Sequence, residues 1–228
     1  IMQIKKILTI FTVCFFSSLI VKDSNAQTEK FLDAFEIVQR SENTFKIVIK
    51  NSDLENFKSY FKIAKAIIIF PEINEGGLFV GAKGGNGVLL VRKDNSWSGP
   101  FFLTMGGVSF GIQFGLKSSK VILTVMTEKG LKSILRERVK FGVDVDAAVA
   151  NQGVGYSAES TIRLADIYSF SDNSGLFIGG SFEGSYIQPR NDLNTAFHKK
   201  SFSSEDILNT SVVHPKATSL INVLKEKK

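Results

Sequence analysis

Residues 66–91 read AIIIFPEINEGGLFVGAKGGNGVLLV, and this stretch decides the class of fold. It begins with a short apolar run, Ala66 to Phe70, rich in β-branched residues, which is typical of a buried strand. We expect Pro71 to end that strand. Glycines then recur between short apolar runs, and Asn86-Gly87 favours a hairpin turn because both residues accept positive φ. The stretch therefore predicts antiparallel strands joined by tight turns.

The same pattern extends outward along the chain. Strands are expected at residues 77–81, 87–91, 108–116, 121–125, 163–170 and 176–187, with breaks at Asp94-Asn95 and at residues 172–175. One helix is expected to interrupt them, from Glu128 to Glu137, since Leu131, Ile134 and Leu135 fall on one side of it. The middle of the chain is thus mainly a sheet.

Both ends of the chain have helical patterns. From Thr28 to Lys50 the apolar residues recur at three- and four-residue steps, as on one stripe of a helix: Phe31, Phe35, Val38, Phe45 and Ile49. The pair Ser52 and Glu55 resembles a capping box and predicts a second helix from Asp53 to about Ala64. Beyond Ser203 the chain again has a helical pattern, and Pro215 is expected to begin a last helix.

Helices at both ends and strands between them predict an α+β fold. The many glycines in the strands favour a strongly coiled or barrel-like, mainly antiparallel sheet with peripheral helices at both ends of the chain. An outer-membrane barrel is a poorer fit, because helices separate the strands. The 228 residues, of which 43% are hydrophobic and 22% charged, suit a single domain that needs no disulfide or metal to fold.

The first 26 residues have the features of a secretory signal peptide. Lys5 and Lys6 precede an apolar run over residues 7–21, which is too short to span a bilayer, and small residues follow up to Ala26. We expect cleavage near Ala26 and a periplasmic or secreted protein over residues 27–228. Whether Ile1 or Met2 is the true start is left open.

Cleavage at Ala26 would also change the charge and the redox chemistry of the chain. It removes three lysines and one aspartate, so the net charge falls from +6 to +4. It also removes Cys14, the only cysteine. Lipid attachment at Cys14 is the weaker alternative, because Val13 stands where a small residue is expected. The mature protein is then mildly basic and free of thiols, which suits an oxidising compartment.

Catalytic motifs are weakly supported. The segment Gly107 to Gly111 matches a nucleophile elbow around Ser109, with His198 or His214 downstream as a base. An elbow needs a helix directly after the serine, whereas residues 112–116 continue a strand pattern. Two histidines and no mature cysteine leave few general bases or nucleophiles, so we expect no enzyme activity.

Cofactor and metal motifs have simpler explanations. The glycines between Gly81 and Gly87 could cradle phosphate, but a strand pattern follows where a helix would be needed, which favours a hairpin. Asp144 and Asp146 resemble part of a calcium loop, yet no further oxygen ligands follow them. We therefore expect neither a cofactor nor a metal site.

Basic residues gather in and just after the expected internal helix: Lys129, Lys132, Arg136, Arg138 and Lys140. Glu128 and Glu137 partly offset them. A solvated helix face is one interpretation. The other is an electrostatic contact with acidic lipid headgroups, to which each basic side chain contributes about 1 kcal/mol. Nucleic acid is not expected as a partner, since no aromatic and basic residues alternate in a binding motif.

Several segments, in order, resemble the SYLF lipid-binding domain family. They are AKAIIIFP at 64–71, GGNGVL at 84–89, WSGP at 97–100, GVSFGIQFG at 107–115, DIYSFS at 166–171, GLF at 175–177 and Glu183-Gly184. The resemblance covers most of residues 28–200. It implies a phospholipid-binding domain without catalytic activity, whose eukaryotic relatives bind phosphoinositides and couple membranes to actin, while exported single-domain relatives are bacterial. The chain is therefore identified as an exported single SYLF-like domain over residues 27–228.

From the charge, the signal peptide and the resemblance we expect peripheral binding to anionic phospholipid at a membrane surface. The alternative is an envelope scaffold that binds a protein partner. The first mature helix offers Phe31, Phe35 and Val38 as residues that insert into the membrane, with Lys30 and Arg40 close by. The same stripe would also suit a helix packed against the sheet.

Overall fold

The structure is a computed structural model that describes residues 26–51, 55–77, 80–94, 96–110, 116–136, 138–141, 144, 147–149, 165–171 and 185–226. Residues 1–25 of the expected signal peptide, the capping residue Ser52 and the turn at residues 172–175 lie outside these ranges.

Eight strands form one sheet in the order β5-β8-β3-β2-β1-β4-β7-β6. Their bounds are β1 (Ala66–Gly77), β2 (Val80–Lys93), β3 (Ser96–Phe110), β4 (Leu116–Val125), β5 (Val139–Lys140), β6 (Ala147–Val149), β7 (Ile167–Ser171) and β8 (Ser185–Pro189). Among the described strand pairs only β6 and β7 run parallel, and a single parallel bridge joins Gly99 of β3 to Val213.

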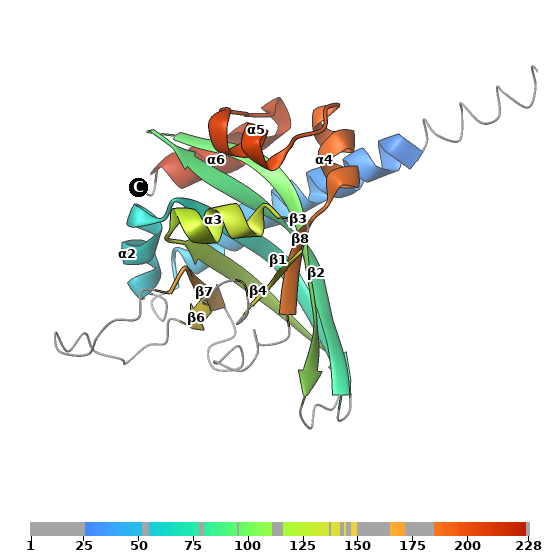
Figure 1. Cartoon of the computed structure of the whole chain (residues 1–228), viewed down its shortest axis with the longest axis vertical. Helices are drawn as coiled ribbons and strands as arrows, with labels where there is room; N and C mark the ends of the chain where they lie inside the picture. The colour runs from blue at the N-terminus through green and yellow to red at the C-terminus, as the bar shows by residue number, and fades with distance from the viewer. Residues whose placement is uncertain are drawn as a thin grey trace, which may run out of the picture.

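Helices come from both ends of the chain and from one insertion between strands. One helix spans residues 26–48, and the others are α2 (Glu55–Ile63), α3 (Glu128–Ile134), α4 (Asn191–His198), α5 (Ser204–Asn209), the 3-10 helix η3 (Pro215–Ala217) and α6 (Thr218–Glu226). Figure 1 shows the long strands β1 to β3 curling between these helices. The expected α+β fold with a curled, mainly antiparallel sheet is confirmed.

Two expectations for the first strands are wrong. Pro71 does not end β1, which continues to Gly77, because a shift in register between Phe70 and Ile73 places the proline at an irregularity. Asn86 and Gly87 do not form a hairpin turn but lie inside β2, paired with β3. Glycine is needed there for a different reason: a Cβ on Gly87 would lie 2.4 Å from the carbonyl oxygen of Ile69.

Helix α4 was missed in the sequence, and side-chain hydrogen bonds fix its position. Asn194 accepts from the backbone N–H of Phe102 at 2.8 Å and donates to its carbonyl at 3.2 Å, which ties the helix to β3. Before the helix, Arg190 pairs with both carboxylate oxygens of Asp192 and donates to Asn86 at 2.9 Å. This pairing lowers the pKa of Asp192 strongly.

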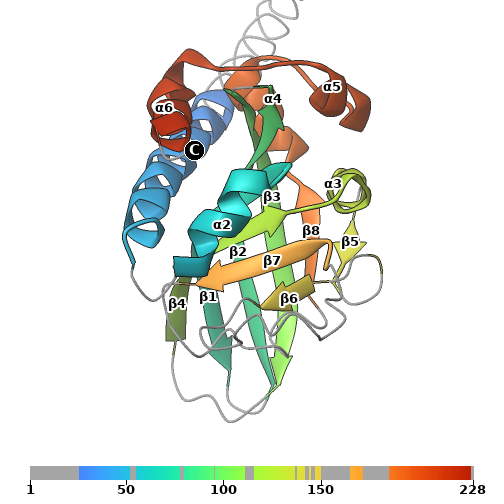
Figure 2. The ribbon, with the colours of Figure 1, turned by 90° about the vertical axis from the view of Figure 1, so that its left-hand side faces the viewer.

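Alternate residues of the strands point to two faces, each with its own core. The first core contains Ile67, Ile69, Val88, Leu90, Phe102 and Phe170, covered by the helix over residues 26–48, α2, α4 and α6. We call this side the aromatic face because eight of its buried members are Phe, Tyr or Trp. The second core contains Ile68, Leu89, Phe101, Leu103 and Leu123, covered by α3 and α5. We call it the pocket face; Figure 2 shows α6 to the left of the long strands and α3 to the right.

Candidate functional site

The five basic residues singled out in the sequence lie on α3, on the segment that follows it and on β5. Helix α3 begins after Thr127, whose hydroxyl accepts from the N–H of Gly130 at 2.9 Å. Its buried side holds Leu131 and Ile134, so the exposed side carries Lys129 and Lys132. The remaining three residues follow the helix, and Lys140 lies on β5.

Strand β8 holds the last part of this group in place. Lys140 pairs with Tyr186 of β8, and the guanidinium of Arg138 lies 3.7 Å from the centre of the Tyr186 ring. The ring has room because Gly106 is opposite it on β3, where a Cβ would come within 2.6 Å of the tyrosine oxygen. A glycine on one strand thus positions a tyrosine that orients an arginine.

Acidic partners neutralise only part of the group. Lys129 lies 3.3 Å from Asp166, a carboxylate that is almost fully buried. Lys132, Arg136 and Lys140 are exposed and make no ion pair with any residue that the structure describes. We call the exposed side chains of Lys129, Lys132, Arg136, Arg138 and Lys140 the α3–β5 surface. Its net positive charge suits an anionic surface.

The structure places the proposed membrane-inserting residues against the aromatic face. Val38 is buried in that core, and Phe31 stacks on Phe197 with ring centres 5.6 Å apart. Phe35 is partly buried, and the Lys216 ammonium lies 5.3 Å from its ring centre. These contacts are those of the alternative in which the helix packs on the sheet. Insertion into a membrane stays a prediction.

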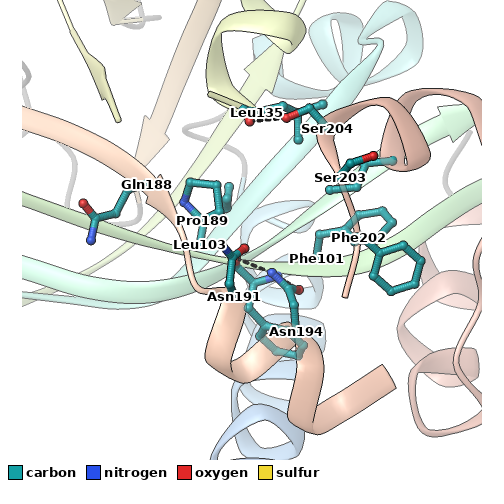
Figure 3. A pocket seen from close by; sticks show the side chains of 12 residues that line it. Phe101, Leu103, Leu135, Gln188, Pro189, Asn191, Asn194, Phe202, Ser203 and Ser204 are labelled. Atoms are coloured by element: carbon teal, nitrogen blue, oxygen red, sulfur yellow. Dashed lines mark hydrogen bonds between the residues drawn. The ribbon is translucent and has the colours of Figure 1, made fainter. Parts of the chain in front are cut away.

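A pocket of about 420 Å³ lies on the pocket face, beside the α3–β5 surface. Its lining includes Phe101, Leu103, Leu135, Gln188, Pro189, Asn191, Asn194, Phe202, Ser203, Ser204 and Ile207. Figure 3 shows Leu135 and Ser204 on one side of the pocket, Gln188 and Pro189 on another, and Phe202 opposite them. The sequence did not reveal this pocket, because its walls come from five separate segments.

Most polar side chains in the pocket are already engaged within the protein. The amide of Asn194 bonds the backbone of Phe102 through both of its ends. Ser203 bonds Asp206 in a capping box, and Ser204 donates to the carbonyl of Leu135 at 2.5 Å. The apolar lining residues Phe101, Leu103 and Ile207 are buried by the protein itself, so polar atoms make up at least half of the surface that the pocket exposes.

A second pocket, of about 310 Å³, is lined by basic residues that make hydrogen bonds and ion pairs within the protein. Arg92 donates to the carbonyls of Phe61 and Ala64 at the end of α2 and lies 4.2 Å from the ring centre of Trp97. Lys65 pairs with Glu128 at 3.0 Å. These cations stabilise helix ends, so we do not regard this pocket as a binding site.

The described part of the chain does not bring together the serine and histidine of the catalytic alternative. Ser109 lies in β3, eight residues beyond Phe101, which is about 26 Å along an extended strand. His198 lies beside Phe101 and bonds the carbonyl oxygen of Pro100 at 2.7 Å, so it is far from Ser109. Among the described residues no group of three or more His, Cys, Asp or Glu side chains could hold a metal ion.

Over the described ranges, no helix is both long enough and apolar enough to cross a bilayer.

Comparisons with known proteins connect this architecture to a family. A family model described as Ysc84, Las17-binding protein actin regulator, matches residues 106–227, more than half of the chain. The matched region includes the α3–β5 surface and most of the pocket wall.

Three similar proteins carry related names. Protein YSC84 of Saccharomyces cerevisiae is 31% identical over 173 residues, covering 73% of this chain and 36% of that protein. LAS seventeen-binding protein 3 of the same species is 30% identical, covering 73% and 37%. SH3 domain-containing YSC84-like protein 1 of Bos taurus is 27% identical, covering 71% and 48%. The chain therefore spans between about a third and a half of the length of these relatives, and it belongs to the Ysc84/SYLF family.

Proposed function

We propose that this chain is a non-catalytic domain that binds anionic phospholipid peripherally at a membrane surface. The observation that supports this most is the α3–β5 surface, where Lys132 and Arg136 are exposed without an acidic partner in the described structure. The side chain of Lys140 is exposed too, and the Asp144 carboxylate accepts from its backbone N–H at 2.8 Å. Exposed cations attract a negatively charged surface, and each adds about 1 kcal/mol near lipid.

We place this activity in the cell envelope. The support is the sequence of residues 1–26, which has the charge, apolar run and small residues of a secretory signal peptide. Mass spectrometry of the mature N-terminus from the native cell tests this placement. A mature chain that begins near Gln27 is expected, and an intact Lys5 and Lys6 would contradict it.

Vesicle sedimentation tests the lipid proposal. The protein should co-sediment with phosphatidylglycerol vesicles but not with phosphatidylcholine vesicles. Binding should weaken as salt rises from 50 to 500 mM, because salt screens exposed charges. Equal binding to both lipids at every salt concentration would contradict the electrostatic mechanism.

Charge reversal tests the assignment of the surface. The triple variant Lys132→Glu, Arg136→Glu and Lys140→Glu should lose at least about tenfold in affinity for anionic vesicles, since three attractive contacts become repulsive. The matched control is Lys50→Glu, Lys117→Glu and Lys225→Glu, which makes the same change in net charge on three other elements. An equal loss in both triples would show that net charge alone matters.

Another basic triple, Lys199, Lys200 and Lys216, would not serve as that control. Lys199 and Lys216 both lower the pKa of His214, so they lie close to the same ring. They form a second basic group at the end of α4 and the start of η3, and reversing them would test another candidate surface.

A protein partner is the second candidate, and the names of the relatives favour it. The matching family model describes a Las17-binding protein and actin regulator. Under this alternative the chain is an envelope scaffold, and crosslinking in intact cells followed by mass spectrometry should recover one dominant protein. Recovery of lipid without such a protein favours the first proposal.

A further inference from the structure

We infer that the end of α4 and the start of η3 form a site for a phosphate group that carries close to two negative charges. Three donors make up this site: the ammonium groups of Lys199 and Lys216 and the ring N–H of His214. The site lies on other elements than the α3–β5 surface. The inference goes beyond the proposed function, because the site requires no membrane.

The ring of His214 presents a hydrogen-bond donor. Its Nδ1 accepts from the backbone N–H of Lys216 at 3.2 Å, so the proton of the neutral ring is on Nε2. This Nε2–H has no acceptor among the residues that the structure describes. The side chain is partly exposed, which leaves the ring accessible to a ligand from solvent.

Packing holds this ring in place. Its centre lies 4.2 Å from the ring centre of Phe197 and 6.3 Å from that of Phe31. The ring of His198 lies 5.7 Å away, and Nε2 of His198 bonds the carbonyl oxygen of Pro100. A donor fixed by α4, by the helix over residues 26–48 and by its own hydrogen bond loses little freedom when it binds.

Two exposed lysines lie near the ring. Lys199 follows His198 directly and ends α4 with a left-handed backbone, at φ 55°. The ammonium of Lys216 lies 5.3 Å from the centre of the Phe35 ring. Burial, Lys216 and Lys199 lower the pKa of the His214 imidazole, and no carboxylate of the described residues is among the causes. Neither lysine makes an ion pair in the part of the chain that the structure describes.

The acidic residues of α4 and α5 act on other cations. Asp192 of α4 accepts two hydrogen bonds from Arg190 and lies 3.5 Å from Lys30 of the first helix. Asp206 of α5 is close enough to Lys200 for their charges to interact, so we leave Lys200 out of the site. The charges of the other two lysines therefore remain available to a ligand.

Two cations and a neutral donor suit a phosphomonoester better than a carboxylate. A phosphomonoester carries a charge of about −1.5 to −2 at neutral pH and has three strong acceptor oxygens, whereas a carboxylate carries a single charge. Hydrogen bonds from lysine to phosphate are about twice as strong as neutral ones. The same chemical group occurs on soluble phosphomonoesters and on phosphatidic acid in membranes.

Titration with soluble probes tests the inference. Glycerol phosphate, a phosphomonoester, and glycerophosphoglycerol, a phosphodiester with one charge, are added at pH 7.5 and constant ionic strength, because salt screens exposed charges. The ring nitrogen signals of both histidines are followed by NMR. Glycerol phosphate should shift the Nε2 signal of His214 and bind about tenfold more tightly than the diester, the gain of one charge-assisted hydrogen bond. Equal binding of the two probes would overturn the inference.

Matched variants locate the site. Lys199→Gln with Lys216→Gln should lower affinity for glycerol phosphate about tenfold or more. Lys117→Gln with Lys225→Gln removes the same charge from other elements and should keep the affinity. His214→Asn retains a side-chain oxygen that can cap η3 but removes the ring donor, so it should also bind more weakly. Unchanged affinity in the first lysine pair or in folded His214→Asn would overturn the inference, as would an equal loss in the control pair.

Vesicles separate the two sources of phosphate. If a membrane supplies it, vesicles with phosphatidic acid should bind more tightly than vesicles with phosphatidylglycerol at matched surface charge, and Lys199→Gln with Lys216→Gln should lose that difference. If the ligand is soluble, glycerol phosphate should bind and the vesicles should show no such difference. Failure of the unaltered protein to bind any phosphomonoester would overturn this site, and vesicle sedimentation would still test the α3–β5 surface separately.

Discussion

The two faces of the sheet are filled in different ways. On the aromatic face, rings from helices and strands contact one another in series: Phe61 lies 5.1 Å from Phe45 and 5.4 Å from Trp97, measured between ring centres. On the pocket face, the buried residues are mostly aliphatic, the short helices α3 and α5 are the described helices that cover them, and a pocket of about 420 Å³ remains there.

Because of this difference, we expect the aromatic face to determine the stability of the fold and the pocket face to take part in binding. Aromatic pairs add about 0.5–1.5 kcal/mol each beyond the area they bury, so the aromatic face stabilises the fold strongly. The pocket face leaves a pocket open to solvent and has the exposed lysines of α3 at its edge. We expect substitutions on the first face to change the free energy of unfolding and those on the second to change affinity for lipid.

The largest expected effect is a cavity on the aromatic face. Phe61→Ala should lower the free energy of unfolding by about 3–5 kcal/mol, because the ring is fully buried and its neighbours on α2 and the sheet cannot close the gap. Ile207→Ala, beside the pocket, should cost only about 2 kcal/mol, the low end for such a truncation. Urea unfolding monitored by circular dichroism measures both.

The opposite order of the two losses in unfolding free energy would contradict this comparison of the faces. A larger loss for Ile207→Ala than for Phe61→Ala would mean that the pocket face carries the main core. Similar slopes of free energy against urea are required in both variants, since a changed slope would reflect a different unfolded state.

Local patterns in the sequence predicted the elements better than their pairing. The stripe from Phe31 to Ile49 predicts the helix over residues 26–48, and Pro215 does begin the last helical segment. The error at Asn86-Gly87 arose because a local preference for a turn competes with a long-range constraint. Gly87 is required by the close approach of β1, which sequence spacing does not reveal.

The candidate site could be predicted only in part, for a related reason. The basic residues of the α3–β5 surface are close in sequence, so their grouping was visible. The pocket joins β3, α3, β8, α4 and α5, and only the sheet order brings β8 beside β3. Helix α4 had a weak signal in Leu193, Ala196 and Phe197, whose three- and four-residue spacing gives one apolar side.

The next prediction sharpens the assignment of the first helix to the aromatic face. The double variant Phe31→Ser and Phe35→Ser should lower the free energy of unfolding by about 2 kcal/mol, since each ring is partly buried against the core. The matched control is Leu32→Ser, because Leu32 is 59% exposed on the same turn of the helix. That change should leave the denaturant midpoint almost unchanged.

Vesicle affinity of the same variants distinguishes the alternative. If the helix inserts into a membrane, the double variant and Leu32→Ser should both bind phosphatidylglycerol vesicles more weakly, with little change in the midpoint for either. A large fall in the midpoint for the double variant with unchanged vesicle affinity would place both rings in the core and remove the insertion proposal.

The smallest expected effect is a loss of stability in mild acid, and it arises at the edge of the aromatic face. Burial lowers the pKa of His198, and burial with the nearby Lys216 and Lys199 lowers the pKa of His214. The rings lie 5.7 Å apart. Both shifts favour the neutral imidazole in the fold, where Nδ1 of His214 accepts from the N–H of Lys216 at 3.2 Å and caps η3.

The sign of the effect follows from the direction of these shifts. An unfolded histidine has a pKa near 6.5, so below that pH the unfolded chain takes up protons that the folded chain resists, and stability falls as pH falls. We expect a lower urea midpoint at pH 5.5 than at pH 7.5. The chain has only these two histidines, so the variant His198→Gln with His214→Asn should lose most of the difference. Asparagine can still cap a helix, which keeps that hydrogen bond without a titrating group. An unchanged pH dependence in this variant would assign the effect to carboxylates instead.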